Sequence, residues 1–337
     1  MRIALDAMGG DFAPAVTVEG AVEAVNETRG LSVTLVGNEN EIADELHGKK
    51  FETSVISVKH ASQVVGMHEA PLTAIRRKKD SSIKVALDLV RAGEADAMVS
   101  AGNSAVVMAK ALLTLGKLTG VDRPAIAAVM PTLKGLFVLI DAGANVDCKA
   151  ANLYQFAIMG EAYAKSIFDI EIPRVGLLGI GEEDAKGNEL TKETFKLLKD
   201  SGLEFIGNIE GKNIFMGDAD VVVCDGFVGN IALKISEGLA EVIAKMLKRE
   251  ISESTSGRIG YFLMKDALRS FRKRTDYSEY GGAPLLGLSK PCIISHGRST
   301  AKAIKNAVKI AGEFYRKGVL DIISKAFTAT GPKKGKR

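Results

Sequence analysis

Apolar residues along this chain follow two alternating patterns. Short runs rich in β-branched residues predict strands at 2–5, 33–36, 54–58, 97–99, 125–130, 136–140, 174–178, 221–224 and 292–294. Between them, apolar residues at helical spacing predict helices at 16–25, 82–92, 103–115, 150–164, 190–199, 231–251 and 301–311. This alternation is typical of a layered α/β fold with a mostly parallel sheet. The turn at Lys134-Gly135 places the strand at 136–140 in a hairpin, so we expect a mixed sheet.

One segment departs from this alternation. The long helix predicted at 231–251 has one apolar face, a polar break follows at 252–257, and a second amphipathic stretch continues to about 271. The piece from Lys248 to Arg274 holds eight Lys or Arg against three Asp or Glu, a net charge of +5. We therefore expect a basic helical hairpin, at about 231–274, that stands off the α/β core.

The domain organisation follows from the lack of a linker. No Pro/Ser-rich stretch and no repeat of fixed period divides the chain of 337 residues. We expect residues 1–330 to form a single compact α/β unit of two intertwined halves that share one sheet. Residues 331–337 are expected to be a solvated basic tail.

Composition excludes several classes of protein. With 46% apolar and 26% charged residues, the chain is neither disordered nor fibrous. A net charge of +4 is too small to indicate a nucleic-acid partner, and no apolar run approaches the roughly 20 residues of a membrane span. The three cysteines and four histidines show no metal-ligand spacing, so we expect no metal and a cytoplasmic protein.

Five predicted strands end in turns of small residues that carry Asp, Asn or Ser. These turns are 6–11, 100–104, 141–145, 179–188 and 224–230. In open α/β sheets, ligands bind beyond the carboxyl ends of the strands, and glycine lets backbone N–H groups approach an anion. A single turn of this kind is best explained as an ordinary connection between a strand and a helix. Asn103 and Asn230 are each in place for a simple helix N-cap. Five such turns together favour a polar site for a small anion.

Two side chains in or near such turns need separate interpretation. Lys186 is either an ordinary solvated lysine or a cation beside a phosphate or a developing oxyanion. Its turn matches neither the dinucleotide nor the nucleoside-triphosphate glycine motif. His296, after the strand at 292–294, is either a site residue or part of a helix-entry turn.

Seven strings, taken in order, resemble one family. They are DAMGGD (6–11), SAGNS (100–104), DAGAN (141–145), GEEDAKGNEL (181–190), CDGFVGN (224–230), YGGAPLLG (280–287) and His296-Gly297. Together they resemble the phosphate acyltransferases of bacterial phospholipid synthesis. Ala105 and Arg298 depart from that pattern, where the family often has Gly and Ser.

The resemblance implies a fold, a reaction and partners. The implied fold is a three-layer α/β/α unit similar to isocitrate/isopropylmalate dehydrogenases and phosphotransacetylases, usually dimeric. The implied reaction converts acyl-(acyl carrier protein) and inorganic phosphate to acyl-phosphate and free carrier protein. No cofactor is implied. The enzyme is expected at the inner face of the cell membrane as a peripheral protein, where a glycerol-3-phosphate acyltransferase uses its product.

The residues fit direct attack by phosphate, because such a reaction needs an anion cradle and a cation but no enzyme nucleophile. We expect the catalytic residues to be Lys186, Asn188, Asp225 and Asn230. We expect phosphate or substrate to be bound by Asp6, Gly9, Gly10, Asp11, Ser100, Gly102, Asn103, Ser104, Asp141, Gly143, Asn145, Gly181 and His296.

The hairpin has two interpretations. Its apolar tip and basic flank predict contact with the membrane surface or the acidic carrier protein through Ile259, Tyr261, Phe262, Leu263, Arg269, Arg272 and Lys273. The alternative is an ordinary dimer interface with its charges in water.

Three other functions compete with this assignment. A phosphotransacetylase-like enzyme would use acyl-coenzyme A in place of the carrier. A metal- and NAD(P)-dependent decarboxylating dehydrogenase would need an Asp cluster and a Lys-Tyr pair that we cannot trace. A non-catalytic membrane scaffold would leave the five polar turns unexplained.

Overall fold

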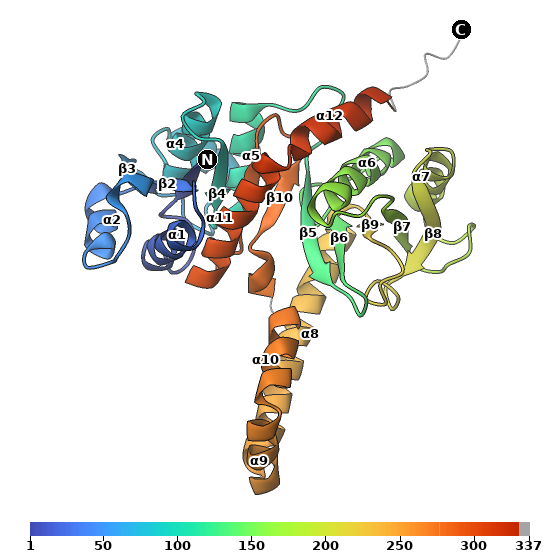
Figure 1. Cartoon of the computed structure of the whole chain (residues 1–337). Helices are drawn as coiled ribbons and strands as arrows, with labels where there is room; N and C mark the ends of the chain where they lie inside the picture. Colours follow the sequence, from blue (N-terminus) through green and yellow to red (C-terminus); the bar gives the residue numbers. More distant parts are fainter. Residues whose placement is uncertain (276, 330–337) are drawn as a thin grey trace.

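The computed structural model describes residues 1–275 and 277–329. It gives the backbone alone for Thr255, Arg258, Ile259, Arg272, Lys273, Thr275, Tyr277, Ser278 and Ala329. The predicted basic tail at 331–337 lies outside the described residues. The described chain folds around an eleven-stranded sheet of order β3-β2-β1-β4-β11-β10-β5-β6-β9-β7-β8. Figure 1 shows helices on both faces of this sheet and a helical hairpin projecting between its two halves.

The strands and helices mostly fall where the apolar pattern predicts them. The strands are β1 (Arg2–Asp6), β2 (Ser32–Gly37), β3 (Ile56–His60), β4 (Ala97–Ser100), β5 (Ala125–Pro131), β6 (Leu136–Ile140), β7 (Arg174–Gly179), β8 (Glu204–Glu210), β9 (Val221–Val223), β10 (Ala283–Leu286) and β11 (Cys292–Ile294). The helices are α1 (Ala15–Glu27), α2 (Glu39–Leu46), α3 (Pro71–Arg77), α4 (Ser82–Arg91), α5 (Ser104–Leu115), α6 (Ala150–Ile167), α7 (Glu189–Lys199), α8 (Gly226–Glu253), α9 (Thr255–Leu263), α10 (Lys265–Thr275), α11 (Ala301–Arg316) and α12 (Val319–Ala329).

Strand direction divides the sheet into two halves. The strands β1, β2, β3, β4 and β11 are mutually parallel, and so are β6, β9, β7 and β8. Three antiparallel pairings, β11–β10, β10–β5 and β5–β6, join the two sets and reverse the direction between them. The carboxyl ends of β1, β4 and β11 therefore share one edge of the sheet, and those of β6, β9 and β7 share the other. The mixed, mostly parallel sheet is confirmed.

Alternating residues of each strand bury opposite sides of the sheet, as the pleat requires. In β1, Ile3 and Leu5 pack with α1 and α11, whereas Ala4 packs in the cluster that contains α4 and α5. In the other half, Val138 and Ile140 pack in the cluster that contains α6, α7 and α12. The result is the three-layer α/β/α arrangement expected from the sequence.

Several boundaries differ from the sequence predictions. The helix predicted at 231–251 begins five residues earlier, because Asp225 accepts a hydrogen bond from Val228 N and caps it. The helix predicted at 259–271 is two helices, α9 and α10, separated at Met264. The edge strand β8 and the helices α2, α3 and α12 were not predicted, and β10 was recognised as a motif but not as a strand.

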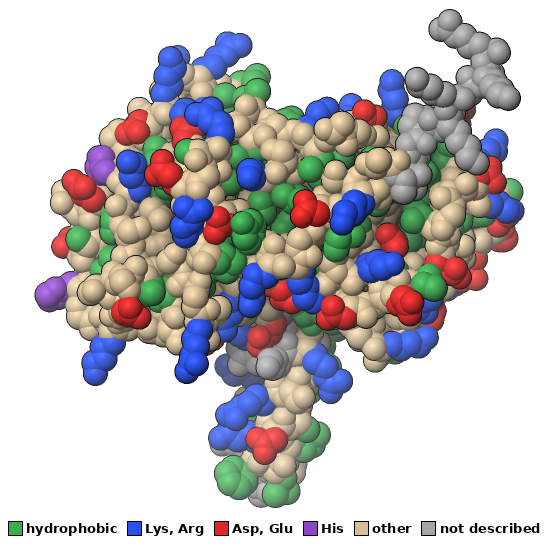
Figure 2. Space-filling view, turned by 45° about the horizontal axis from the view of Figure 1, so that its top comes forward, with side chains coloured by type: hydrophobic (Ala, Val, Ile, Leu, Met, Phe, Trp, Pro, Cys, Tyr) green, Lys and Arg blue, Asp and Glu red, His purple; other side chains and the backbone are tan. Residues whose placement is uncertain are grey.

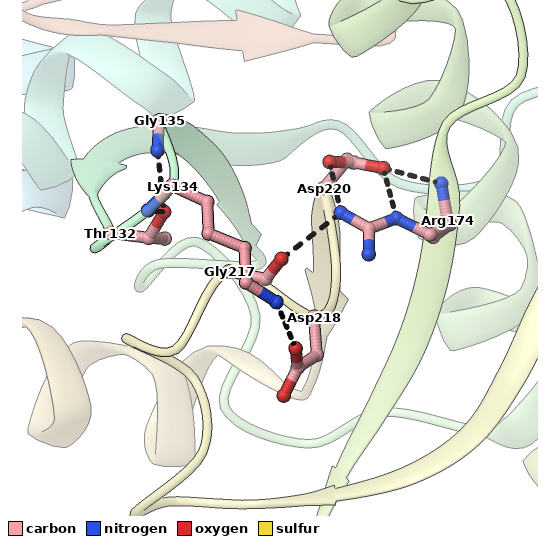
Figure 3. A network of polar contacts seen from close by, with 7 residues as sticks. All are labelled: Thr132, Lys134, Gly135, Arg174, Gly217, Asp218 and Asp220. Atoms are coloured by element: carbon pink, nitrogen blue, oxygen red, sulfur yellow. Dashed lines mark hydrogen bonds and ion pairs between the residues drawn. The ribbon is translucent and has the colours of Figure 1, made fainter.

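A network of charged side chains lies at the amino ends of β7 and β9, away from the turns at the carboxyl ends of the strands. Arg174 Nε and Nη2 donate to the Asp220 carboxylate at 3.0 and 2.9 Å, and Nη2 also donates to Gly217 O (Figure 3). Lys134 pairs with Asp218 in the same network at 2.8 Å. These contacts tie the strand starts together, which assigns this cluster of charges a structural role.

The α1–α11 contact has no room for a side chain at Gly20. A Cβ there would lie 2.6 Å from Ala301 O and 2.7 Å from Ile304 Cβ. Gly20→Ala should therefore lower the free energy of unfolding by about 1–3 kcal/mol, as overpacked cores do. The matched control is Gly238→Ala in the exposed middle of α8, where nothing lies within 4 Å and the substitution should be neutral or stabilising. Urea unfolding of both variants measures the difference, and equal stabilities would contradict this packing.

Candidate functional site

Two of the predicted polar turns, 6–11 and 100–104, meet the turn that carries His296 at the carboxyl ends of β1, β4 and β11. We call 6–11, 100–104 and 295–298 the first turn group. Its centre is the Asp6 carboxylate, which is fully buried and accepts hydrogen bonds from Ser100 Oγ at 2.6 Å and Met8 N at 3.2 Å. Ser100 Oγ in turn accepts from Gly102 N at 3.0 Å. Burial raises the pKa of Asp6, and the hydrogen bond from Ser100 opposes that shift.

Glycines let the backbones of this group touch. A Cβ at Gly9 would lie 2.5 Å from Asp6 Oδ2 and 2.7 Å from Gly102 N, so no larger residue fits there unless its neighbours move. Asp11 N donates to Gly297 O at 2.8 Å, which joins the first and third turns of the group. Gly10 has a φ of 107°, a conformation that L side chains rarely adopt. The predicted residues Asp6, Gly9, Gly10, Asp11, Ser100 and Gly102 are thus brought together.

The side chain of Asn103 is fully engaged within the protein. Its Oδ1 accepts from Val106 N and caps α5, and its Nδ2 donates to Met67 O at 3.0 Å and Glu69 O at 3.1 Å. The predicted helix N-cap is therefore confirmed for Asn103. Any contact of Asn103 with a ligand must come from its backbone, while the N-terminus of α5 at Ser104 presents N–H groups and a favourable field to an anion.

His296 is the residue of the first turn group on which charged groups of α8 act. Its Nδ1 accepts from Arg298 N at 3.1 Å. Burial lowers the pKa of His296, and Lys234 of α8 lowers it further, while Asp11 and Glu237 act in the opposite direction. His296 therefore favours the neutral form and has charged groups from both α8 and the first turn group nearby.

The turns after β6 and β9 form a second turn group, 141–145 and 225–230. The buried Asp141 carboxylate collects five donors: Oδ1 accepts from Ile126 N, Gly143 N and Ala144 N, and Oδ2 accepts from Asn145 N and Asn145 Nδ2 at 2.7–2.8 Å. Burial raises the pKa of Asp141 and these hydrogen bonds lower it. The carboxylate thus holds the whole turn in one shape.

The start of α8 packs directly on this turn. A Cβ at Gly226 would lie 2.7 Å from Asn145 N and 2.9 Å from Asp141 Oδ2. Asn230 lies over Gly143, with its Cβ 3.4 Å from where a Gly143 Cβ would be. The alternative interpretation of Asn230 as an N-cap is wrong, because Asp225 caps the helix and Asn230 stands within it.

The helix α8 carries residues that relate to both turn groups. Asn230 and Lys234 are four residues apart and share one face of this helix. Asn230 contacts the second turn group, and Lys234 acts electrostatically on His296 of the first. Lys234, which pairs with Glu237 at 2.7 Å, is a candidate residue that the sequence analysis missed. The available signal was its i+4 spacing from Asn230.

The loop 181–188 follows β7, the neighbour of β9, and carries Lys186 and Asn188. Asn188 Oδ1 accepts from Thr191 N at 2.9 Å and caps α7. Gly181 is buried against the aliphatic part of Lys186. The Lys186 ammonium is exposed and makes no hydrogen bond or ion pair with any residue that the structure describes. Its assignment to the reaction stays a prediction.

Two hollows on the described surface lie elsewhere. One, of about 300 Å³, is lined by residues of 25–31 with Glu52 and Val55, and the other, of about 120 Å³, adjoins the Arg174–Asp220 network. Neither includes a turn-group residue. Within the described ranges, no three His, Cys, Asp or Glu are grouped to hold a metal ion.

The hydrogen bonds to Asp141 lead to a prediction about the stability of the protein. In Asp141→Asn, an NH2 group replaces one carboxylate oxygen. This group cannot accept a hydrogen bond, so the buried N–H groups that donate to that oxygen lose their partner. We expect the free energy of unfolding to fall by about 3 kcal/mol. Asp147→Asn, an exposed change in the same loop, should cost less than about 0.5 kcal/mol. Chemical denaturation compares the two variants, and equal effects would show that Asp141 does not organise the turn.

Comparisons with known proteins place the chain in a family. A family model described as "Fatty acid synthesis protein" matches residues 1–322. A phosphate acyltransferase from Thermodesulfovibrio yellowstonii is 57% identical over 330 residues, covering 98% of this chain and 95% of that protein.

Solved structures with low sequence identity share the fold. A phosphotransacetylase from Streptococcus pyogenes matches with a TM-score of 0.60 at 20% identity, over 97% of this chain and 94% of that one. A 4-hydroxythreonine-4-phosphate dehydrogenase from Klebsiella pneumoniae matches with a TM-score of 0.53 at 12% identity, over 94% and 97%. The expected likeness to phosphotransacetylase and dehydrogenase folds is confirmed. The family model and the near-complete coverage at 57% identity show that this chain belongs to the fatty acid synthesis protein family and is an enzyme of the phosphate acyltransferase kind.

Proposed function

We propose that the protein transfers an acyl group from acyl-(acyl carrier protein) to inorganic phosphate and so feeds phosphatidic acid synthesis. The observation that carries this proposal is the pair of glycine-lined turn groups, each built on a buried aspartate, with α8 starting on the second group and Lys234 of α8 acting electrostatically on His296 of the first. Backbone N–H groups at such turns and at the N-terminus of α5 suit a small anion. The phosphate acyltransferase relatives support the same reaction.

The reaction balances without an enzyme nucleophile. An oxygen of hydrogen phosphate attacks the thioester carbonyl carbon, a C–O bond forms, and the carbonyl oxygen carries negative charge in the tetrahedral intermediate. Collapse of this intermediate breaks the C–S bond. The proton of hydrogen phosphate balances the thiol that leaves with the carrier protein. The protein must therefore place two reactants and stabilise one developing oxyanion.

Each predicted catalytic residue has a role in this scheme. The first turn group holds phosphate through backbone N–H groups and Ser104, while Lys186 steadies phosphate or the oxyanion. Asn230, which lies over Gly143, supplies a hydrogen bond to the reacting groups. Asn188 and Asp225 act through the helix starts that they cap.

The test is direct formation of acyl-phosphate. Purified protein is mixed with acyl-carrier protein and radiolabelled phosphate, and labelled acyl-phosphate is measured against release of free carrier thiol. We expect both products in equal amounts. Acyl-coenzyme A in a parallel reaction tests the alternative, and a faster rate with coenzyme A than with the carrier would favour a phosphotransacetylase-like enzyme.

Lys186→Ala should lower kcat about 10²-fold, because loss of one donor to a developing oxyanion typically costs that much. The fold should be unaffected, since the ammonium has no partner among the described residues. Lys192→Ala, an exposed lysine on α7, is the matched control and should keep full activity. Near-normal turnover of Lys186→Ala at saturating phosphate would remove Lys186 from the mechanism.

We also propose that the protein works as a homodimer, cytoplasmic and peripherally bound at the inner face of the membrane, beside a downstream glycerol-3-phosphate acyltransferase. No helix within the described residues is long and apolar enough to cross a membrane. The hairpin carries apolar side chains at its tip and Lys or Arg along its sides (Figure 2). Phe262 and Leu263 are 77% and 78% exposed there.

Other residues of the hairpin are also exposed. Tyr261 and Arg269 are exposed as well, whereas the side chains of Ile259, Arg272 and Lys273 lie outside the described residues. The apolar face of α8 is exposed at Ile235, Leu239, Val242 and Met246, and a second copy of the chain would cover it in the proposed dimer.

Replacing the tip residues tests the membrane contact. The double variant Phe262→Glu and Leu263→Glu should lose binding to anionic vesicles, because charge on the tip opposes its burial in the lipid interface. Activity on soluble acyl-carrier protein should be retained. Ile172→Glu, a change of similar exposure elsewhere, is the control in the same vesicle sedimentation assay. Unchanged sedimentation of the double variant would refute the tip as a lipid contact.

A further inference from the structure

The segment from Gly66 to Lys79 lies beside the first turn group. Asn103 Nδ2 donates to Met67 O and Glu69 O, and the Met67 side chain packs against Gly297. The segment is thus fastened both to the start of α5 and to the turn that follows β11. The outer surface of this segment therefore belongs to an element that contacts the proposed phosphate site directly.

The helix α3 within this segment has distinct inner and outer faces. Ala74 is fully buried against the core, whereas Leu72 is 72% exposed. Arg76 follows Leu72 at i+4 and therefore shares its outer face, and Arg77 is exposed beside it. We call Leu72, Arg76, Arg77 and Lys79 the α3 face.

The charges of the α3 face are not neutralised by the protein. Lys78 pairs with Glu69 at 2.5 Å. Arg76, Arg77 and Lys79 are exposed and make no ion pair with any described residue. Cations are favourable near the C-terminus of a helix, which makes them compatible with α3 but leaves their charged groups in solvent.

A buried cation lies beneath the same helix. Lys110 of α5 is 7% exposed, and its Nζ donates to Ile75 O at 3.0 Å. Burial lowers the pKa of Lys110, and the nearby Lys84 and Lys79 lower it further against the opposing effect of Asp88. The hydrogen bond from Lys110 to Ile75 O fastens α3 to α5 and holds the α3 face in place.

We propose that the α3 face docks the acidic acyl carrier protein while its thioester reaches the turn groups; this rests on the proposed function. One exposed leucine flanked by three free cations complements an acidic surface with a small apolar contact. A lipid surface is the weaker match, since the α3 face has a single apolar side chain, whereas the hairpin tip exposes Tyr261, Phe262, Leu263 and Met264 in sequence.

Charge reversal tests this surface. The triple variant Arg76→Glu, Arg77→Glu and Lys79→Glu should raise KM for acyl-carrier protein about tenfold or more and leave kcat within about twofold, as changes in docking charges do. The KM of the unmodified protein should also rise with salt, and the variant should lose this dependence. The control reverses three exposed cations elsewhere, Arg29→Glu, Lys50→Glu and Lys59→Glu, for the same change in net charge.

Two further measurements distinguish a failure of this docking proposal from a failure of the variant to fold and from a failure of the proposed function. The variant Arg76→Gln, Arg77→Gln and Lys79→Gln avoids acidic charge at the helix end and should raise KM in the same direction if the Glu variant does not fold. Titration with holo-carrier protein measures docking without turnover, so absent acyl-phosphate formation would defeat the proposed function while leaving this test intact. Unchanged KM and unchanged carrier affinity in both triple variants would overturn the proposal. So would unchanged carrier affinity with lost binding to anionic vesicles, which would assign the α3 face to lipid.

Discussion

Two buried carboxylates shape the ends of the strands on which the candidate site depends. Asp6 and Asp141 are each fully buried. Asp6 accepts from Met8 N of its own turn and from Ser100 Oγ at the end of β4, whereas Asp141 gathers donors mainly from the turn that follows it. A buried charge is costly unless it is well paired, so each turn must keep the shape that supplies these donors. The turn backbones are then fixed before any ligand arrives. The N–H groups of Gly143, Ala144 and Asn145 are already bonded to Asp141, so the second turn group must meet an anion through other groups, such as the side chain of Asn230.

The reversal of strand direction at β10 and β5 gives these turns their arrangement. Parallel strands within each half bring their own turns together, but the halves point in opposite directions along the sheet. The long helix α8 reconnects them, because it begins on the Asp141 turn and passes His296. The same helix then leaves the core as one arm of the hairpin, which links the proposed site physically to the proposed membrane contact.

The sequence predicted the layered fold, the mixed sheet and most of its elements, because buried strands and amphipathic helices have distinct periods. It predicted the turns as sites because Gly, Asn and Asp follow apolar runs at each strand end. It did not predict that the Asn103 side chain donates to Met67 O and Glu69 O, nor that Lys234 acts electrostatically on His296. These interactions join residues far apart in the chain, and no local spacing encodes the reversal at β10, where Pro284 lies inside a strand.

The central claim is that both turn groups hold one phosphate. A crystal structure of the protein soaked with orthophosphate tests it most directly. The account predicts one phosphate in hydrogen-bonding contact with backbone N–H groups of the first turn group and with Asn230 of the second. A phosphate bound by one group alone, or bound away from both, would contradict it.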